Sequence, residues 1–202
     1  MDGTVFFTTS ISPRLPEREN EAQLLAECRA GKDAAWGRFY QLFGGYVYSL
    51  CRRYGVAEGE IVDTVQEVFA QVFLNLKSYD PVKGALKPWV RALAINIVLM
   101  HLRKQSRGRI VYLEDYSDDV QVSGRGVLDQ LNQEALLSIV AKLPLNLRLV
   151  FNLSVVDGYS HREIAERLTI SEATSRQHLT RAKQWLRRHL SQPSVKQAYG
   201  LF

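Results

Sequence analysis

Side chains that can read DNA bases recur along one face of a helix predicted near the C-terminal end of the chain. Arg, Gln and Thr side chains hydrogen-bond to base edges, and a single helix fits the major groove. Five Arg or Lys residues stand against one Glu between residues 171 and 190, which suits a phosphate-binding surface. The base-reading candidates are Arg176, Gln177, Thr180, Arg181 and Gln184. An ordinary basic amphipathic helix on a bundle surface is the alternative.

The residues around this face predict the helix-turn-helix that would position it. Ser160 and Glu163 form a capping box, so a helix begins there. A short turn at residues 169–170 follows, and Ser171 caps the second helix. The inward stripe of that helix consists of Leu179, Ala182 and Leu186. Because caps, turn, stripe and charge agree, residues 159–190 predict a DNA-binding motif.

The rest of the chain is patterned as helices and divides into two blocks. We expect an all-α fold with two small helical domains joined by a flexible acidic linker, the second domain containing the helix-turn-helix. The predicted parts are a flexible N-terminal arm (1–19), a helical domain (20–106), the linker (107–127), the helix-turn-helix domain (128–190) and a C-terminal tail (191–202). No strand is expected.

Within the first block, two helices and a loop carry most of the polar signal. One helix is expected from about residue 58 to 76, with Ile61, Val65, Val68, Phe69, Val72, Phe73 and Leu76 on its apolar side. The loop SYDPVKGALKP follows it, and another helix is expected from Trp89 to about Arg103. In an earlier helix the pair Gly44-Gly45 is expected to cause weakening or a bend.

Composition excludes several classes of protein. The 202 residues carry 26 Lys or Arg against 21 Asp or Glu, and the formal net charge is +5. Cys28 and Cys51 lack metal-ligand spacing, so reduced structural thiols of a cytosolic protein are expected. The longest apolar stretch, residues 92–100, is about half the length that a bilayer requires, so no integral membrane segment is expected. Because the common nucleotide-binding and hydrolase motifs are missing from the sequence, we expect no enzyme, no catalytic residue, no cofactor and no metal site.

Several segments resemble a known family. The first domain of the extracytoplasmic-function (ECF) sigma factors of bacterial RNA polymerase is similar, in order, to LLAECRAGKDAAWGRFYQLF, DTVQEVFAQVF and KPWVRALAINIVLMHLRK. Their second domain is similar to AKLPLNLRLVFNLSVVDGYSHREIAERLTISEATSRQHLTRAKQWL. The resemblance covers residues 20–190. It implies a non-enzymatic, cytoplasmic subunit that directs core RNA polymerase to promoters by recognising minus-10 and minus-35 elements. The implied partners are core RNA polymerase, promoter DNA and an anti-sigma factor.

The resemblance also assigns roles to individual residues. The polymerase-binding positions are Asp63, Gln66 and Glu67; a solvated helix face is the alternative. The positions for minus-10 DNA are Tyr79, Lys83, Trp89, Asn96, Arg103 and Lys104. Trp89 fits a core position as well as a wedge, and Asn96 fits a satisfied buried amide as well as a base reader. The positions for minus-35 DNA are Thr174, Arg176, Gln177, His178, Thr180, Arg181 and Lys183.

A departure from the family pattern, an ambiguous linker segment and a rival function accompany this resemblance. The family often carries basic residues where this chain has Ala92 and Ile95, so Arg91, Arg103 and Lys104 would have to supply the phosphate contacts of that helix. The carboxylates between Glu114 and Asp119 fit either a mimic of nucleic acid or a solvated linker. A free-standing helix-turn-helix transcription regulator is the alternative function, and such a protein would not co-elute with core polymerase.

Overall fold

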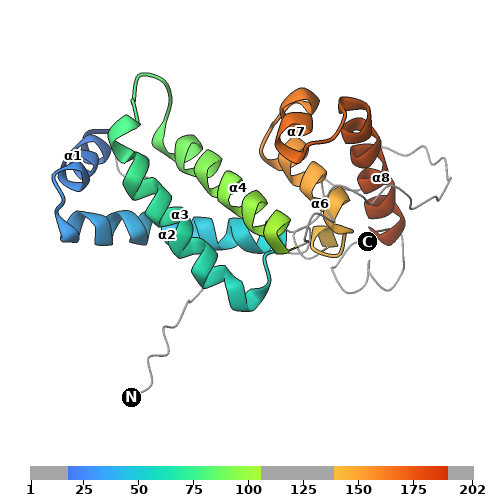
Figure 1. Cartoon of the computed structure of the whole chain (residues 1–202), viewed down its shortest axis with the longest axis horizontal. Coiled ribbons are helices and arrows are strands. Elements are labelled where there is room, and N and C mark those ends of the chain that lie inside the picture. The colour runs from blue at the N-terminus through green and yellow to red at the C-terminus, as the bar shows by residue number, and fades with distance from the viewer. Residues whose placement is uncertain (1–17, 106–138, 191–202) are drawn as a thin grey trace, which may run out of the picture.

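A computed structural model describes residues 18–105 and 139–190 (Figure 1), and every regular element in these residues is helical. The all-α prediction is therefore confirmed. The first block contains α1 (Arg18–Arg29), α2 (Asp33–Tyr54), α3 (Ile61–Asn75) and α4 (Leu86–Gln105), with 3-10 turns η1 (Glu58–Glu60) and η2 (Leu76–Ser78) flanking α3. The second contains α6 (Leu145–Phe151), the π-helical η5 (Asn152–Val156), α7 (His161–Leu168) and α8 (Glu172–Leu190).

Three of the predicted boundaries fall outside the described residues. They are those of the linker at 107–127, of the start of the second domain at 128 and of the tail at 191–202. The predicted arm at 1–19 also lies outside them, except for its last two residues, which begin α1. The domain limits therefore stay predictions.

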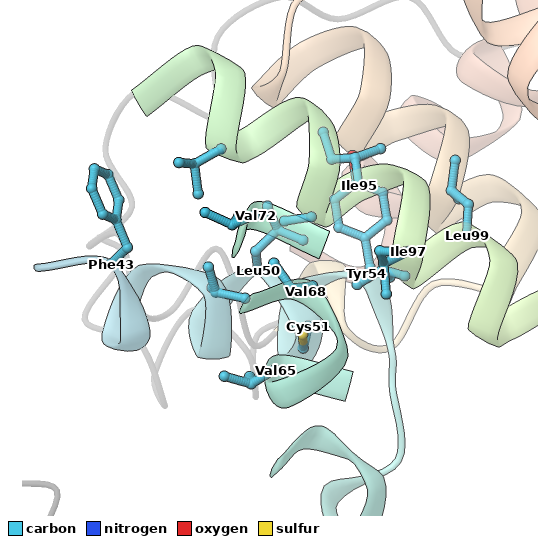
Figure 2. Packing of buried hydrophobic residues seen from close by; sticks show 14 of the residues in the cluster. Phe43, Leu50, Cys51, Tyr54, Val65, Val68, Val72, Ile95, Ile97 and Leu99 are labelled. Carbon is cyan, nitrogen blue, oxygen red and sulfur yellow. The ribbon is translucent and has the colours of Figure 1, made fainter. Parts of the chain in front are cut away.

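The core of the first block is built from three helices with apolar residues at helical spacing (Figure 2). Figure 2 shows side chains of α2, among them Leu50 and Tyr54, directed toward Val65, Val68 and Val72 of α3 and Ile95 of α4. This stripe of α3 is buried as predicted, whereas Phe73 is 56% exposed. The helix α2 runs uninterrupted through Gly44-Gly45, the pair expected to weaken it.

The helix α4 starts earlier than the sequence pattern indicates. It begins at Leu86, three residues before Trp89, and includes Pro88 in its first turn. Proline is tolerated there because the first-turn N–H groups have no partner within the helix. Leu86 is buried in the same core, so packing favours the extra residues.

The second block is organised by two helix caps that the sequence predicts correctly. Ser160 Oγ accepts a hydrogen bond from the Glu163 backbone N–H at 3.3 Å, and the Glu163 carboxylate accepts one from the Ser160 N–H at 2.8 Å. Ser171 Oγ accepts from the Thr174 N–H at 3.0 Å, which fixes the start of α8. Between them Thr169 ends α7 in the left-handed conformation with φ 58°.

Buried apolar residues form two clusters, and one of them crosses between the blocks. The core of the first block continues into the second through Leu149, Val150, Leu153, Ile164 and Leu168. A separate cluster fastens α8 to the start of the second block through Ile139, Val140, Leu143, Phe151, Ala182, Leu186 and Leu190. The helix-turn-helix is therefore packed against the rest of its own block and, through the shared apolar cluster, against the first block.

Cys28 and Cys51 are free and buried, as expected of structural thiols. Burial raises the pKa of Cys51 to about 12 and also raises that of Cys28. In the described ranges we find no helix with the length and apolar character to cross a membrane. The same ranges hold no group of three or more His, Cys, Asp or Glu side chains suited to a metal.

Candidate nucleic-acid interface

The polar face of α8 is open to solvent. Arg176, Gln177, Thr180 and Lys183 are exposed, and Thr174 and Arg181 are partly exposed. Arg176 forms an ion pair with Glu172 one turn earlier, at 2.7 Å. The hydroxyl of Thr180 donates to the Arg176 carbonyl at 3.0 Å. A row of donors and cations on a well-capped helix can enter a major groove and reach base edges.

His178 differs from the other residues of the predicted minus-35 set because it is buried, with 9% of its surface exposed. It lines a small cavity with Asn146, Leu149, Leu168 and Ile170. Burial lowers the pKa of His178, and the positive charge of Arg181 lowers it further. The structure thus places His178 on the inward side, against the prediction that it contacts DNA.

The position of His178 follows from a stripe that the sequence reading missed. Ser175, His178 and Ala182 recur at spacings of three and four residues and are all buried. Ser175 Oγ lies 2.9 Å from Nδ1 of His161, which ties α8 to the first turn of α7. The spacing was readable in the sequence, but the polar types of Ser175 and His178 obscured it.

The loop before α4 is shaped by Tyr79 rather than lined by it. Only 5% of Tyr79 is exposed, its hydroxyl donates to the Gly84 carbonyl at 2.9 Å, and its ring centroid lies 5.1 Å from that of Trp89. Burial raises the pKa of Tyr79. Lys83 is exposed at the tip of this loop. Tyr79 therefore holds the loop against α4, which differs from the expected contact of its side chain with minus-10 DNA.

On α4, two of the predicted minus-10 residues, Asn96 and Arg103, touch the second block. Asn96 is exposed, and its Oδ1 accepts a hydrogen bond from Nη1 of Arg167 at 2.6 Å. Arg103 donates to the Arg167 backbone carbonyl. Lys104 is exposed and Trp89 is half-buried. Arg167 itself belongs to α7 and stacks over the Tyr159 ring at 4.4 Å.

A second contact between the blocks centres on Asp157, which the sequence reading did not single out. Its side chain is 2% exposed, and both carboxylate oxygens accept from Nη2 of Arg53, at 3.0 and 2.9 Å. The Tyr54 hydroxyl donates to it at 2.7 Å, and Nη1 of Arg91 lies 4.0 Å away. Burial, followed by the negative charge of Asp157, raises the pKa of Tyr54.

The three residues proposed for polymerase binding lie together on α3. Asp63, Gln66 and Glu67 are exposed on the side of the helix opposite the buried stripe. Exposed apolar side chains lie on the same helix, with Val62 and Phe73 each 56% exposed and Leu74 67% exposed. Such a mixed polar and apolar surface is typical of a protein-binding face.

Comparison with known proteins gives matches in both blocks. The family model "Sigma-70 region 2" matches residues 39–108, and "Sigma-70, region 4" matches residues 133–186. The ECF RNA polymerase sigma factor SigW of Bacillus subtilis is 25% identical over 184 residues, covering 82% of this chain and 94% of SigW. SigE of Mycolicibacterium smegmatis is 25% identical over 169 residues, covering 81% of this chain and 65% of SigE. The sigma-E factor of Escherichia coli K12 is 26% identical over 181 residues, covering 84% and 94%.

Two solved structures of complexes are weaker matches. CnrH in complex with the cytosolic domain of CnrY is 21% identical with a TM-score of 0.46, covering 82% of this chain and 94% of that one. RpoE of Bartonella quintana in complex with the anti-sigma factor NepR is 15% identical with a TM-score of 0.47, covering 75% and 94%. These scores are too low to establish a shared arrangement of the helices.

The two region models occur in the order expected of a sigma factor, and the relatives that span nearly the whole chain are ECF sigma factors. The chain belongs to the sigma-70 family, as a sigma factor of the ECF type.

Proposed function

We propose that this ECF sigma factor directs core RNA polymerase to specific promoters, with α8 reading the minus-35 element and α4 with its preceding loop reading the minus-10 element. The observation that carries the proposal is the open face of α8, where cations and hydrogen-bonding side chains stand in a row on a capped helix-turn-helix. The domains would be those expected from the sequence, 20–106 and 128–190. We place the protein in the cytoplasm and assign it no enzymatic activity.

For the minus-35 element we propose a set without His178. Arg176 and Gln177 lie in the N-terminal half of α8, where a recognition helix reaches base edges. Thr174, Thr180, Arg181 and Lys183 extend the surface toward the phosphates. His178 would act indirectly, by holding α8 in place against the core of its own domain.

For the minus-10 element we propose Asn96 as the base reader of α4. Its exposure favours DNA contact over the role of a satisfied buried amide. Lys83, Arg103 and Lys104 would supply charge for the DNA backbone, and Trp89 would support the loop. Tyr79 would shape that loop through its bond to Gly84 and would not itself stack on a base.

For the polymerase we propose the α3 face of Asp63, Gln66 and Glu67. The double substitution Gln66→Ala with Glu67→Ala should weaken binding to core polymerase, while the free energy of unfolding changes by less than about 0.5 kcal/mol because both side chains are exposed. Glu166→Ala, an exposed acidic residue of α7 with 69% side-chain exposure, is the matched control.

Gel filtration of the chain with core polymerase tests the proposal. The wild type and Glu166→Ala should co-elute with core in stoichiometric amounts, and the double variant should not. A wild-type chain that never co-elutes would favour the free-standing regulator, and a double variant that binds normally would move the contact elsewhere. An anti-sigma factor is a further proposed partner.

A further inference from the structure

The loop that leads into α4 is exposed but has bonds of its own that give it a shape. The Lys83 N–H donates to the Asp80 carbonyl at 3.1 Å, and the Val82 N–H donates to the Asp80 carboxylate at 3.0 Å. Residues 81–85 are all exposed, and Val82 is 92% exposed. Because these bonds lie within the loop, the place where the loop stands depends on the residues at its two ends.

The start of the loop is fastened to α1 by Arg29. Arg29 belongs to the last turn of α1, and its Nη2 donates to the Tyr79 carbonyl at 2.6 Å. Its Nε donates to the Leu76 carbonyl at 3.4 Å. Leu76 begins η2 and Tyr79 follows it, so one guanidinium spans the turn between α3 and the loop. In Figure 1, α1 lies beside the end of α3 from which this loop leaves.

A guanidinium suits this position for two reasons. The carbonyl groups at the C-terminal end of a helix lack partners within the helix and carry the negative end of its dipole. The planar fork of an arginine donates from two nitrogens in a fixed geometry, which the ammonium group of a lysine does not. Arg29 therefore fixes the direction in which the chain leaves α3.

We infer that Arg29 is a positioning residue for minus-10 recognition: by bonding the Leu76 and Tyr79 carbonyls, it sets where the loop stands against a promoter strand. The inference rests on the proposed function, which assigns this loop to the minus-10 element. A binding loop has to be held within about 0.5 Å of its working position. Loss of Arg29 should let the loop shift, so base selection should suffer more than folding.

Three variants separate positioning from charge and from general stability. Arg29→Ala removes both hydrogen bonds and the charge. Arg29→Lys keeps the charge but loses the two-nitrogen fork. Arg38→Ala is the matched control, because Arg38 is an exposed arginine of α2 whose ion pair with Glu27 also holds α1 but involves no loop residue.

Hydrogen exchange in the free full-length chain tests the anchor itself. The Tyr79 N–H donates to the Leu76 carbonyl at 3.3 Å, and this is the same oxygen that Arg29 bonds. Arg29→Ala should raise the exchange rate of the Tyr79 N–H by about fivefold, the effect of one lost hydrogen bond on local opening. Arg29→Lys should give an intermediate rate, and Arg38→Ala should match the wild type.

Base selection is measured in the holoenzyme, with a pool of barcoded templates that carry random sequence upstream of a common transcript. Arg29→Ala should lower the enrichment of the preferred minus-10 bases about fivefold, the lower end of what a direct base contact supplies, and leave minus-35 enrichment within about twofold of the wild type. A merely structural defect would lower total transcription without changing the ratio of the two enrichments. Arg29→Lys should recover minus-10 selection only in part.

Wild-type exchange or wild-type minus-10 selection in a folded Arg29→Ala would each overturn the inference, and so would an equal loss in Arg38→Ala. Full recovery in Arg29→Lys would also overturn it, because Arg29 would then act by charge alone. If circular dichroism shows that Arg29→Ala does not fold, Arg29→Lys decides alone. A wild type that enriches no minus-10 bases would count against the proposed function instead.

Discussion

The two helices proposed to read DNA, α4 and α8, differ in what surrounds them. α8 buries a narrow stripe, with Ser175, Ala182 and Leu186 inward, and leaves its other face to solvent. α4 is buried along most of its length by α2, α3 and the second block, and its exposed Asn96 is bonded to Arg167. In Figure 1 the block of α6 to α8 lies at the C-terminal end of α4. The polar face of α8 is therefore open to solvent, whereas on α4 the exposed side chains of Asn96 and Arg103 are already bonded to the second block.

This difference teaches that the type of a side chain does not decide its availability. Both helices carry amides and cations of the kinds that contact DNA. Arg167 of α7 engages Asn96 and Arg103 of α4, whereas the contacts of Arg176 with Glu172 and Thr180 stay within α8. Variants at the contacts of Arg167 should therefore affect the α4 side alone.

The largest effect should come from Gly55→Ala, at the point where Arg148 of the second block meets the end of α2. Gly55 has φ 95°, and an added Cβ would collide with the Arg148 guanidinium, whose Nη1 donates to the Ala141 carbonyl at 2.8 Å. Gly158→Ala is the control, because Gly158 has φ 77° but open space around it. In both variants the left-handed conformation should lower the free energy of unfolding, measured in urea, by about 1–2 kcal/mol. Gly55→Ala should lower the free energy of unfolding by roughly 1 kcal/mol more, because it also disrupts the hydrogen bond of Arg148. Equal losses in the two variants would contradict the contact between Gly55 and Arg148.

The next effect concerns Asn96→Ala, which removes both the hydrogen bond from Arg167 and a proposed base reader. We expect promoter opening, measured by permanganate reactivity of thymines near the start site, to lose about 2 kcal/mol, or roughly thirtyfold. A pre-melted bubble template should restore most of the transcription. If Asn96 served only to bind Arg167, its loss would leave promoter opening unchanged.

On the open helix we expect a smaller effect that separates base reading from phosphate binding. Arg176→Ala should cost about 1–2 kcal/mol of binding free energy on the correct promoter and relax the sequence specificity there. The cost is somewhat reduced because Arg176 gives up its ion pair with Glu172 when it binds DNA. Lys183→Ala should weaken binding to all sequences equally and lower the salt slope by about one. Binding isotherms on matched and scrambled promoter duplexes measure both; identical sequence dependence would contradict the assignment.

The smallest effect should be a pH dependence of the second domain. Because the pKa of His178 is lowered from the ordinary 6.5 in the folded state, the unfolded chain takes up the proton first as the pH falls. Stability should be full above about pH 7 and decline as the pH falls through the ordinary value. His178→Leu should flatten this part of the profile in thermal melts at pH 7.5 and 5.5. A slope equal to that of the wild type would show that His178 is not the group responsible.

Local features of this chain could be predicted from the sequence, and long-range ones could not. The caps at Ser160 and Ser171 depend on residues three positions apart, so their pattern was visible. The pairing of Arg53 with Asp157 joins residues 104 positions apart, and nothing near either residue signals it. His178 and Tyr79 were assigned to DNA from the resemblance, but both are buried, His178 in a cavity with Leu168 and Ile170 and Tyr79 against the Trp89 ring. Spacing would have placed His178 correctly.

Transcription from a fragment library of the source genome, with core polymerase and with or without this chain, tests the central claim most directly. Mapping of RNA 5′ ends should show start sites that depend on the chain, preceded by two shared elements at a fixed spacing. Arg176→Ala should redistribute these sites by altering the upstream element alone. If the chain produces no new start sites, or if the new sites share no upstream elements, it does not act as a promoter-specificity subunit.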